Sequence, residues 1–262
     1  MRGIVKQVTK AVGLYEPLVR ARDRKRPWHE GLSPEHLEEM QAFYARFVSR
    51  GSLVFDIGAN VGNRTGVFRQ LGARVIAVEP QPHCLNRLRG SFGHDPEVTL
   101  EAVALGPELG QATMHVGDVS TVSSLSEDWV DAMRKSGVMG TAWSKTITVP
   151  LVRFDTLIER HGEPDFCKID VEGFEPQVLS GLSRPVRCMS LEYQTQFHVS
   201  LGQCLERLRS LGEYRFQFSE GESMRLGFED WMDEQELTAR IETMRDAGGP
   251  EFFGDVYARF AD

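Results

Sequence analysis

The stretch VFDIGANVGN, residues 54–63, decides the fold that we expect for this chain. An apolar run ends in Asp56, and two glycines, Gly58 and Gly62, follow it. This pattern is typical of a buried strand that turns sharply into a helix. Gly58, Asn60 and Gly62 are residue types that accept a left-handed backbone readily. The helix beyond them would present free N–H groups to the anionic part of a ligand, so the turn is a predicted binding site.

Asp56 narrows the choice of ligand. A carboxylate at the end of the strand would repel a pyrophosphate, but it would attract a ligand that carries a cation beside its own carboxylate. S-adenosyl-L-methionine has such an amino-acid end and also a sulfonium. The spacing D-x-G-x-N-x-G, moreover, departs from the dinucleotide pattern G-x-G-x-x-G. We therefore expect S-adenosyl-L-methionine as the cofactor, with an NAD-dependent sugar oxidoreductase as the alternative.

The next apolar run, residues 74–78, supports this interpretation because Glu79 follows it. An acidic side chain at the tip of a strand can accept hydrogen bonds from both hydroxyls of a ribose. The other interpretation of Glu79 is an exposed acid before Pro80. Given the turn at Asp56, we expect Glu79 to contact the ribose.

Apolar, β-branched runs alternate with segments of helical period along most of the chain. The runs are 53–57, 74–78, 98–104, 166–169 and 188–192, and helices are expected at 62–71, 82–92 and 174–182. Strands that alternate with helices predict an α/β fold with a mainly parallel sheet and helices on both faces. Two further runs, 214–218 and 252–260, are expected to form an antiparallel pair at the edge. Ahead of the sheet, Ser33 and Pro34 predict a helix start, and its apolar stripe should pack on the domain up to Gly51.

Composition argues against several other classes of protein. With 262 residues and 41% hydrophobic content, the chain can bury one sizeable core. A net charge of −8 argues against a protein that coats nucleic acid. The cysteines show no metal-ligand spacing, and no apolar stretch is long enough to span a membrane. We expect a cytoplasmic protein without a metal site.

The first 51 residues are expected to form a separate helical arm, and residues 52–262 the catalytic domain. Residues 1–26 are rich in Lys and Arg. They are expected to form a helix packed on the domain; the alternative is a weak association with a membrane surface. The segments 106–150 and 220–250 are candidates for acceptor binding, the first because its pattern is irregular. Three tryptophans, Trp129, Trp143 and Trp231, could stack on an acceptor or belong to the core.

The stretch DFCKIDVEGFE, residues 165–175, carries charges where a central strand should be apolar. Lys168 and Asp170 need partners there, because an unpaired buried charge is costly. We expect a cluster of Asp56, Lys168, Asp170 and Glu192 at the carboxyl ends of the strands. For Lys168 the alternative is an ion pair that only fixes the strands. Glu172 follows and is expected to point into the cleft.

On these motifs the sequence resembles the FkbM family of S-adenosylmethionine-dependent methyltransferases. The pieces that carry the resemblance are VFDIGANVGNRT, VIAVEPQPHCLNRL, VTLEAVALG, STVSSL, FCKIDVEGFEPQVLSGL, MSLEY and FGDVYARF. They extend from about residue 52 to the end of the chain. The resemblance implies a Rossmann-like class I methyltransferase fold, with seven strands of which the last is antiparallel, and transfer of a methyl group to a hydroxyl oxygen. It also implies a sugar, a glycolipid or a secondary metabolite such as a polyketide as the acceptor.

The resemblance also assigns residues to the cofactor. Asp56, Gly58, Asn60 and Gly62 would face its methionine part, Glu79 the ribose, and Ala102 and Val103 the adenine. Ser123 and Ser124 would border the cofactor or the acceptor, and Pro80 and Asp170 complete the expected contacts.

Methyl transfer to an alcohol needs one proton to be removed, so a general base is expected. The candidates are Glu172, Asp170 and His198, with Lys168 as a further catalytic candidate near the ligand. A magnesium ion on acidic residues could act instead, but the sequence shows no close set of three carboxylates. Besides the oxidoreductase, a catalytically silent partner protein that only binds the cofactor is an alternative.

Overall fold

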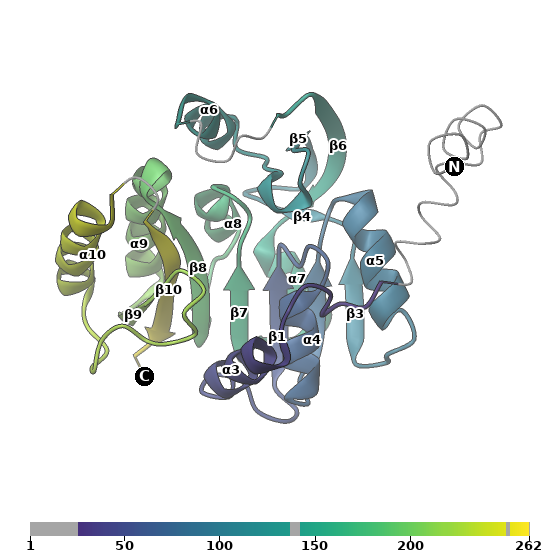
Figure 1. Ribbon diagram of the computed structural model, residues 1–262, viewed down its shortest axis with the longest axis horizontal. Coiled ribbons are helices and arrows are strands. Elements are labelled where there is room, and N and C mark those ends of the chain that lie inside the picture. Colours follow the sequence, from purple (N-terminus) through teal and green to yellow (C-terminus); the bar gives the residue numbers. More distant parts are fainter. Residues whose placement is uncertain (1–25, 137–141, 250–251, 262) are drawn as a thin grey trace.

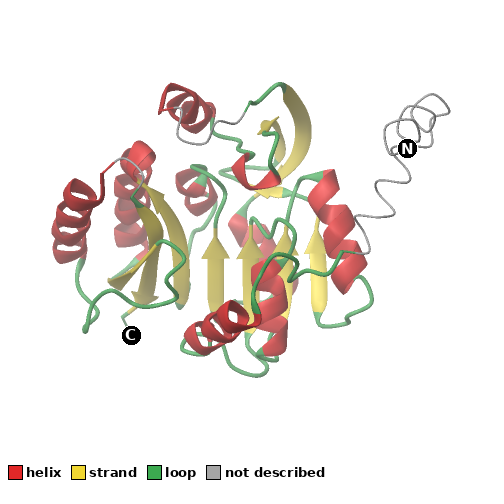
Figure 2. Ribbon diagram, viewed as in Figure 1, coloured by secondary structure: helices red, strands yellow, loops and turns green. Residues whose placement is uncertain are grey.

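The computed structural model describes residues 26–136, 142–249 and 252–261, and its main feature is a seven-stranded sheet (Figures 1 and 2). The strands lie in the order β3-β2-β1-β7-β8-β10-β9. Their bounds are β1 Leu53–Ile57, β2 Arg74–Val78, β3 Val98–Glu101, β7 Phe166–Ile169, β8 Cys188–Gln194, β9 Tyr214–Glu220 and β10 Phe253–Phe260. β10 runs antiparallel to β8 and β9, whereas β1, β2, β3, β7 and β8 pair in parallel. The expected mainly parallel sheet with an antiparallel last strand is confirmed.

Helices cover both faces of the sheet, because its strands carry apolar residues on both sides. On one face, α7 (Phe154–His161), α8 (Glu175–Ser180), α9 (His198–Leu211) and α10 (Glu234–Gly248) share a core with Phe55 and Ile57. On the other face, α3 (Pro34–Tyr44) and α4 (Asn63–Gln70) pack on Val54 and Phe166. α5 (Pro82–Phe92) closes a smaller cluster against Ala77. Side chains alternate between the faces of a strand, so Asp56 and Lys168 lie on the α3 and α4 side.

The helix α3 begins where the sequence predicts. Ser33 caps it by accepting a hydrogen bond from the backbone N–H of His36, and Pro34 is its first residue. The buried Phe43 and Tyr44 pack on the sheet, as expected of the apolar stripe. The helix ends at Tyr44, however, and turns rather than helix continue to Gly51. The expected basic arm, residues 1–26, lies outside the described residues apart from Arg26.

Residues 104–152 contain more regular structure than the sequence suggested. A three-stranded sheet of order β4-β6-β5 is built from β4 (Ala104–Leu105), β5 (Gly110–Val116) and β6 (Lys145–Val152), and α6 (Glu127–Ser136) stands beside it. The run expected at 98–104 as one strand is therefore divided between two sheets. Figure 1 shows this small sheet and α6 above the carboxyl ends of β1 and β7. The segment thus forms a roof over the edge where a ligand is expected.

The second expected insertion, 220–250, is largely occupied by α10. The buried Leu237 and Ile241 of this helix belong to the core, so most of the segment has a packing role. Short 3-10 helices at Ser120–Val122 and Thr195–Phe197 complete the elements. Within the described part of the chain, no helix combines the length and the apolar content needed to cross a membrane.

Candidate functional site

A cavity of about 220 Å³ opens between the carboxyl edge of the main sheet and the roof. The segments that line it follow β1, β2, β3, β7 and β8, and the roof and the loop after β9 contribute further residues. Its polar lining includes Asn60, Glu79, Gln81, Ser120, Thr121, Ser123, Asp170, Glu172, Glu192 and Glu222, and its apolar lining includes Ile57, Val78, Val103, Leu105, Met114, Leu125, Val171 and Phe174. The site therefore combines an apolar wall with many carboxylates.

The turn after β1 has the backbone that its residue types predicted. Gly58, Asn60 and Gly62 all have positive φ angles, of 85°, 49° and 94°. A Cβ on Gly58 would lie 1.8 Å from the carbonyl oxygen of Asp170, so only glycine allows the turn to approach the strand end of β7 so closely. Gly58 and Asn60 line the cavity. Gly62 does not, and its missing side chain instead makes room for Phe92 of α5.

Asp56 lies below the cavity and not in its wall. Its side chain is 1% exposed, and its carboxylate accepts a hydrogen bond from the hydroxyl of Thr65 in α4. Burial raises the pKa of Asp56, an effect that the bond from Thr65 and the charge of Lys168 oppose. The expectation that Asp56 faces the ligand is therefore corrected: in this structure the carboxylate ties β1 to the first crossover helix.

Glu79 lies in the cavity wall, at the tip of β2, as expected. Its two carboxylate oxygens accept hydrogen bonds from the backbone N–H groups of Asn60, at 2.9 Å, and Gln81, at 2.7 Å. A carboxylate has about four acceptor positions, so each oxygen can still accept one bond from a ligand hydroxyl. Burial raises the pKa of Glu79 to about 7, against the effect of these hydrogen bonds. The carboxylate is thus oriented before any ligand binds.

The remaining cofactor candidates follow β2 and β3 or lie in the roof. Val103 and Ser123 line the cavity, as does Pro80. Ala102 is exposed and Ser124 is fully buried, and neither lines the cavity. Ser124 has a different function, because its hydroxyl donates a 2.6 Å hydrogen bond to the carbonyl oxygen of Glu172.

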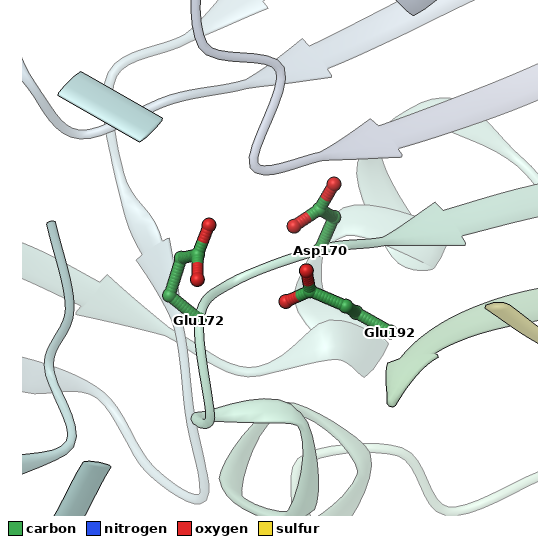
Figure 3. Close-up of side chains that lie close together, drawn as sticks. All are labelled: Asp170, Glu172 and Glu192. Atoms are coloured by element: carbon green, nitrogen blue, oxygen red, sulfur yellow. The ribbon is translucent and has the colours of Figure 1, made fainter. Parts of the chain in front are cut away.

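Three carboxylates meet at the ends of β7 and β8. Asp170, Glu172 and Glu192 each offer an oxygen, and these atoms lie within 4.8 Å of one another (Figure 3). Such a group can share protons or be bridged by a divalent cation. The sequence placed Asp170 and Glu192 in one cluster at the strand ends and Glu172 in the cleft, but it did not indicate that the three carboxylates come this close. The reason for expecting no metal, the lack of a close set of three acids, is therefore wrong.

Glu172 is held in an unusual backbone conformation by several neighbours. Its φ is 55°, and Gly173 after it has a φ of 84°. The side-chain amide of Gln194 donates a 3.1 Å hydrogen bond to Oε2 of Glu172, and Gln194 itself accepts one from the indole N–H of Trp129. Left-handed non-glycine residues concentrate at functional sites. The contacts therefore fix one orientation of the Glu172 carboxylate.

Burial and like charges alter the acidity of the triplet. Burial is the main cause that raises the pKa of Glu172 well above its ordinary value, and the charge of Asp170 adds to it. The pKa of Glu192 is raised in the same way, by burial and then by Glu172. Two neighbouring carboxylates cannot both ionise at the usual pH. The pKa values of both glutamates therefore lie above that of a free glutamate.

A carboxylate that sequence reasoning missed supports this turn. Glu175 is 2% exposed and accepts hydrogen bonds from the backbone N–H groups of Val171, at 3.0 Å, and Gly173, at 3.3 Å. Burial raises its pKa to about 7. Glu175 begins α8, so its carboxylate closes the loop that carries Glu172. In the sequence, Glu175 could have been recognised as an acidic residue in the first turn of a predicted helix, where a carboxylate is favourable.

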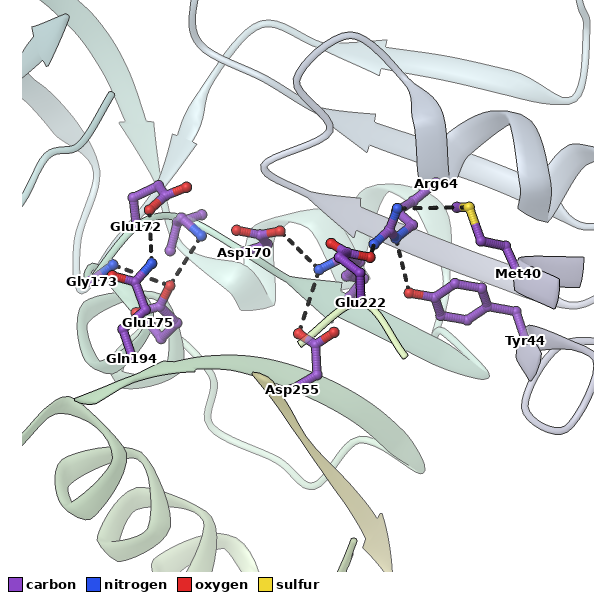
Figure 4. A network of polar contacts seen from close by, with 12 residues as sticks. Met40, Tyr44, Arg64, Asp170, Glu172, Gly173, Glu175, Gln194, Glu222 and Asp255 are labelled. Atoms are coloured by element: carbon purple, nitrogen blue, oxygen red, sulfur yellow. Dashed lines mark hydrogen bonds and ion pairs between the residues drawn. The ribbon is translucent and has the colours of Figure 1, made fainter. Parts of the chain in front are cut away.

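The buried cation near the site is paired from both sides (Figure 4). Lys168 is 3% exposed and its ammonium lies 2.9 Å from Asp170 and 3.7 Å from Asp255 of β10. Burial lowers the pKa of Lys168, but the charges of Asp170 and Asp255 raise it more, so it lies well above its ordinary value. The expected cluster is corrected: Asp255 is the second partner, and Asp56 and Glu192 are not. Lys168 does not line the cavity.

A second buried cation connects the loop after β9 to the site. Arg64 of α4 donates to the hydroxyl of Tyr44 and forms an ion pair with Glu222, which lines the cavity (Figure 4). Burial lowers the pKa of Arg64, but nearby Tyr44 and Glu222 raise it above its ordinary value. Glu222 is the one lining residue from the expected 220–250 insertion.

Other candidates lie outside the cavity. His198 is exposed at the start of α9, and its Nδ1 lies 3.4 Å from the carbonyl oxygen of Thr195. The expectation that His198 could be a base is thus corrected by its position. Trp129 and Trp143 are core residues, 0% and 8% exposed, and Trp231 lies at the opposite edge of the sheet.

The lining fits the cofactor that the sequence predicts. Glu79 presents acceptors suited to ribose hydroxyls, and Val103, Leu105 and Leu125 offer an apolar wall for a base. The turn at Gly58 brings bare backbone to the cavity, and the carboxylates around it favour a ligand with cationic groups. The cavity brings together some of the expected binding residues, namely Gly58, Asn60, Glu79, Pro80, Val103, Ser123 and Asp170. The other expected residues, Asp56, Gly62, Ala102 and Ser124, do not line it.

Comparisons with known proteins agree with this geometry. A family model described as the methyltransferase FkbM domain matches residues 56–220. The comparison with curated proteins found no match. Among solved structures, an O-methyltransferase from Bacillus cereus in complex with SAH is 13% identical, with 98% of this chain and 97% of that chain covered and a TM-score of 0.45.

Two further solved structures are similar to the same extent. A precorrin-6y C5,15-methyltransferase from Geobacter metallireducens GS-15 is 13% identical, with 88% of this chain and 92% of that chain covered and a TM-score of 0.44. A TehB-like SAM-dependent methyltransferase from Corynebacterium glutamicum is 12% identical, with 84% and 87% covered and a TM-score of 0.43. At this level of similarity the fold assignment depends on the strand order and the family match.

Proposed function

The chain belongs to the FkbM methyltransferase family, and from this premise we propose that it is an O-methyltransferase. Its fold is the Rossmann-like class I methyltransferase fold, and its cofactor is S-adenosyl-L-methionine. The observation that supports transfer to oxygen is Glu172. This glutamate lines the cavity, has a raised pKa and is held in one orientation by Gln194. A hydroxyl acceptor needs such a base, because its proton must leave as the new bond forms.

The bound cofactor supplies an electrophilic methyl group on a sulfonium. Glu172 would accept the proton that the acceptor hydroxyl loses when its oxygen takes this methyl group. Gln194 fixes Oε2 of Glu172, so Oε1 is the oxygen that would take the proton. The protein mainly orients the acceptor and holds this proton. Asp170 and Glu192 are the neighbours to which the proton can then move.

The acceptor that we propose is a hydroxyl of a sugar, a glycolipid or a polyketide-like metabolite. The carboxylates that line the cavity, among them Asp170, Glu172, Glu192 and Glu222, disfavour an anionic acceptor. Carboxylates are also the usual acceptors for the hydroxyls of a polyol. Nucleic acid is disfavoured for the same reason. The cytoplasmic location expected from the sequence stays a prediction.

The alternatives make different predictions. The oxidoreductase alternative requires NAD in this cavity. The family assignment to methyltransferases therefore argues against it. A silent partner protein would bind S-adenosylhomocysteine and transfer no methyl group. The base Glu172 and its positioning contacts favour an active enzyme.

The test combines binding and turnover. Calorimetry with S-adenosylhomocysteine and with NAD should show saturable binding of the first alone. Incubation with isotope-labelled S-adenosyl-L-methionine and a panel of neutral sugars, amino sugars, glycolipids and polyketide alcohols should then yield a labelled methyl ether, identified by mass spectrometry. Transfer to nitrogen or carbon, or cofactor binding with no transfer across the panel, would overturn the proposal.

A further inference from the structure

A second cavity, of about 450 Å³, lies at the amino edge of the main sheet, opposite the catalytic cavity. It is bordered by the turns after α3, by the segments that lead into β7 and β8, by the loop after β9 and by the end of β10. Figure 1 shows α3 and the end of β10 at this lower edge of the sheet. The polar and aromatic residues of its lining are Arg46, Phe47, Ser49, Ser52, Asp165, Arg187, Trp231 and Arg259. We call this cavity the arginine groove.

The three arginines of the groove lack the partners that most other arginines have. Among the described residues, no carboxylate or carbonyl group pairs with the guanidinium of Arg46, Arg187 or Arg259, and all three are exposed. Most other described arginines are paired, for example Arg184 with Glu163 and Arg240 with Glu236, and the exceptions are Arg50, Arg89 and Arg225. The chain as a whole carries a net charge of −8, so a cationic groove is unusual for it.

Only one carboxylate lines the groove, and it is already used. Asp165 accepts a hydrogen bond from the backbone N–H of Leu53 at 2.9 Å, and its own N–H donates to the carbonyl oxygen of Leu53. With three guanidinium groups against one carboxylate, the lining has two positive charges in excess. Those charges are free to attract an anion from outside the described chain.

Two of the arginines line the groove from the ends of neighbouring strands. Arg259 of β10 pairs in register with Cys188 of β8, and Arg187 directly precedes Cys188. The backbone N–H of Phe260 donates to the carbonyl oxygen of Arg187, which locks this register. Both residues line the groove, so the two strands bring two cationic residues to one cavity.

The groove also has a flat surface and hydroxyl groups. The guanidinium of Arg259 lies 4.5 Å from the ring centre of Trp231, which holds it over the indole. Ser49 and Ser52 lie at the same edge, with their hydroxyl oxygens 3.2 Å apart. Arginine forks match the oxygens of phosphate, and hydroxyls add donors to them.

We propose that the arginine groove binds a phosphate monoester group, from a soluble molecule or from a lipid headgroup. A phosphate monoester carries about −1.5 to −2 charges near neutral pH, which matches the excess of two positive charges in the lining. A carboxylate would balance only half of it. The groove lies at the amino edge of the sheet, so its ligand binds apart from the cofactor and does not depend on the proposed methyl transfer.

Calorimetry on the full chain tests the proposal with phenyl phosphate, inorganic phosphate and benzoate. Phenyl phosphate should bind with saturation, and benzoate should bind more weakly by on the order of 10-fold, because it carries less charge. The double variant Arg187→Gln/Arg259→Gln should weaken phosphate binding by on the order of 10-fold or more. The single variant Arg46→Gln provides a second test that leaves both strands intact.

The matched control is Arg184→Gln/Arg240→Gln, which removes two exposed, paired arginines outside the groove. It should bind phenyl phosphate as the unmodified chain does, and every variant should keep its affinity for S-adenosylhomocysteine. Sedimentation with phosphatidylcholine vesicles, with and without phosphatidic acid, distinguishes the two sources of phosphate. Binding only to vesicles that contain phosphatidic acid, lost in the groove variants, would identify a lipid headgroup and support the proposal.

Three results would overturn it. The first is binding weaker than about 1 mM for every phosphate probe, vesicles included. The second is equal weakening in the groove variants and in the control variants. The third is equal affinity for benzoate and phenyl phosphate, which would show that the groove does not select phosphate.

Discussion

The two edges of the main sheet carry opposite charges, and the charged side chains at the two edges differ in burial and in their partners. At the carboxyl edge, five acidic side chains line the catalytic cavity, namely Glu79, Asp170, Glu172, Glu192 and Glu222. At the amino edge, three arginines line an open groove with a single carboxylate. Four of these carboxylates are partly or fully buried, and Glu222 is exposed but paired with Arg64. The three arginines are exposed and have no carboxylate or carbonyl partner among the described residues.

The difference shows that burial changes the acidity of a side chain, whereas exposure leaves its charge unchanged. Burial raises the pKa of Glu79 to about 7 and that of Glu172 well above its ordinary value. An exposed arginine keeps its charge and can only attract an anion. The carboxyl edge is therefore suited to proton transfer, and the amino edge to binding. The predictions below test this contrast, from the largest expected effect to the smallest.

Glu172→Gln should abolish most turnover. If the glutamate takes the proton from the acceptor, its loss should lower kcat by on the order of 10²- to 10⁴-fold. The affinity for S-adenosylhomocysteine should stay the same, because glutamine preserves the shape of the side chain. Steady-state kinetics and calorimetry give the two values. His198→Ala is the control and should retain a normal kcat. A normal kcat for Glu172→Gln would show that Glu172 is not the general base.

Lys168→Met should cost about 3–5 kcal/mol of unfolding free energy, measured by urea denaturation. It leaves Asp170 and Asp255 without their cation at the crowded acidic edge. Adding Asp255→Asn to this variant should recover part of the loss. Arg240→Met breaks an exposed pair and should change stability far less. If Lys168→Met lost as little stability as Arg240→Met, the carboxylates of Asp170 and Asp255 would not need Lys168 to balance their charge.

Glu79→Ala should weaken S-adenosylhomocysteine binding by about 1–3 kcal/mol, because a pair of ribose hydroxyls would lose its acceptor. Glu79→Gln, which keeps one acceptor oxygen, should lie between this variant and the unmodified chain. Calorimetry measures both. Glu206→Ala, an exposed change on α9, provides the reference. Unchanged affinity in Glu79→Ala would show that the carboxylate of Glu79 does not contact the cofactor.

Stability should depend on pH in a direction that burial of acids predicts. The pKa values of Glu79 and Glu175 are raised from 4.5 to about 7, so the folded state binds more protons than the unfolded state between these values. Stability should therefore fall as pH rises from about 4.5 to about 7. Thermal unfolding across this range measures the slope.

Glu175→Gln should flatten that slope, since an amide cannot ionise but can still accept the bonds from Val171 and Gly173. Glu206→Gln, on the surface, should leave the slope as it is. If the stability of the unmodified chain instead rose with pH over this range, the folded state would favour the ionised carboxylates. Burial would then not raise their pKa values, and the contrast drawn between the two edges would be wrong.

The sequence predicted much of the fold because its signals are local. The apolar runs marked each strand of the main sheet, and Ser33 and Pro34 marked the start of α3. Errors occurred where distant segments decide the structure. Residues 98–104 were expected as one strand, yet Ala104 and Leu105 pair with β6, about 45 residues away, and leave the main sheet.

The candidate site divides in the same way. The turn residues Gly58 and Asn60 and the strand-end acid Glu79 were placed correctly in the cavity wall, because each is tied to the end of a strand. Asp56 was misplaced because the hydroxyl that binds it, on Thr65, comes from the facing helix. Gln194, Glu222 and Asp255 were missed, since nothing in their local sequence distinguishes them from other polar residues.

By itself the sequence determined the positions of the parallel strands, the sharp turn after β1 and the acids at the strand ends. These follow from periodicity and from backbone preferences, which act between neighbours in the chain. Only the tertiary structure decided the remaining partners: Asp255 beside Lys168, Glu172 close to both Asp170 and Glu192, and the arginines gathered at the other edge. Strand pairing brings these residues together across long stretches of sequence, and burial then sets their charge, which no local pattern records.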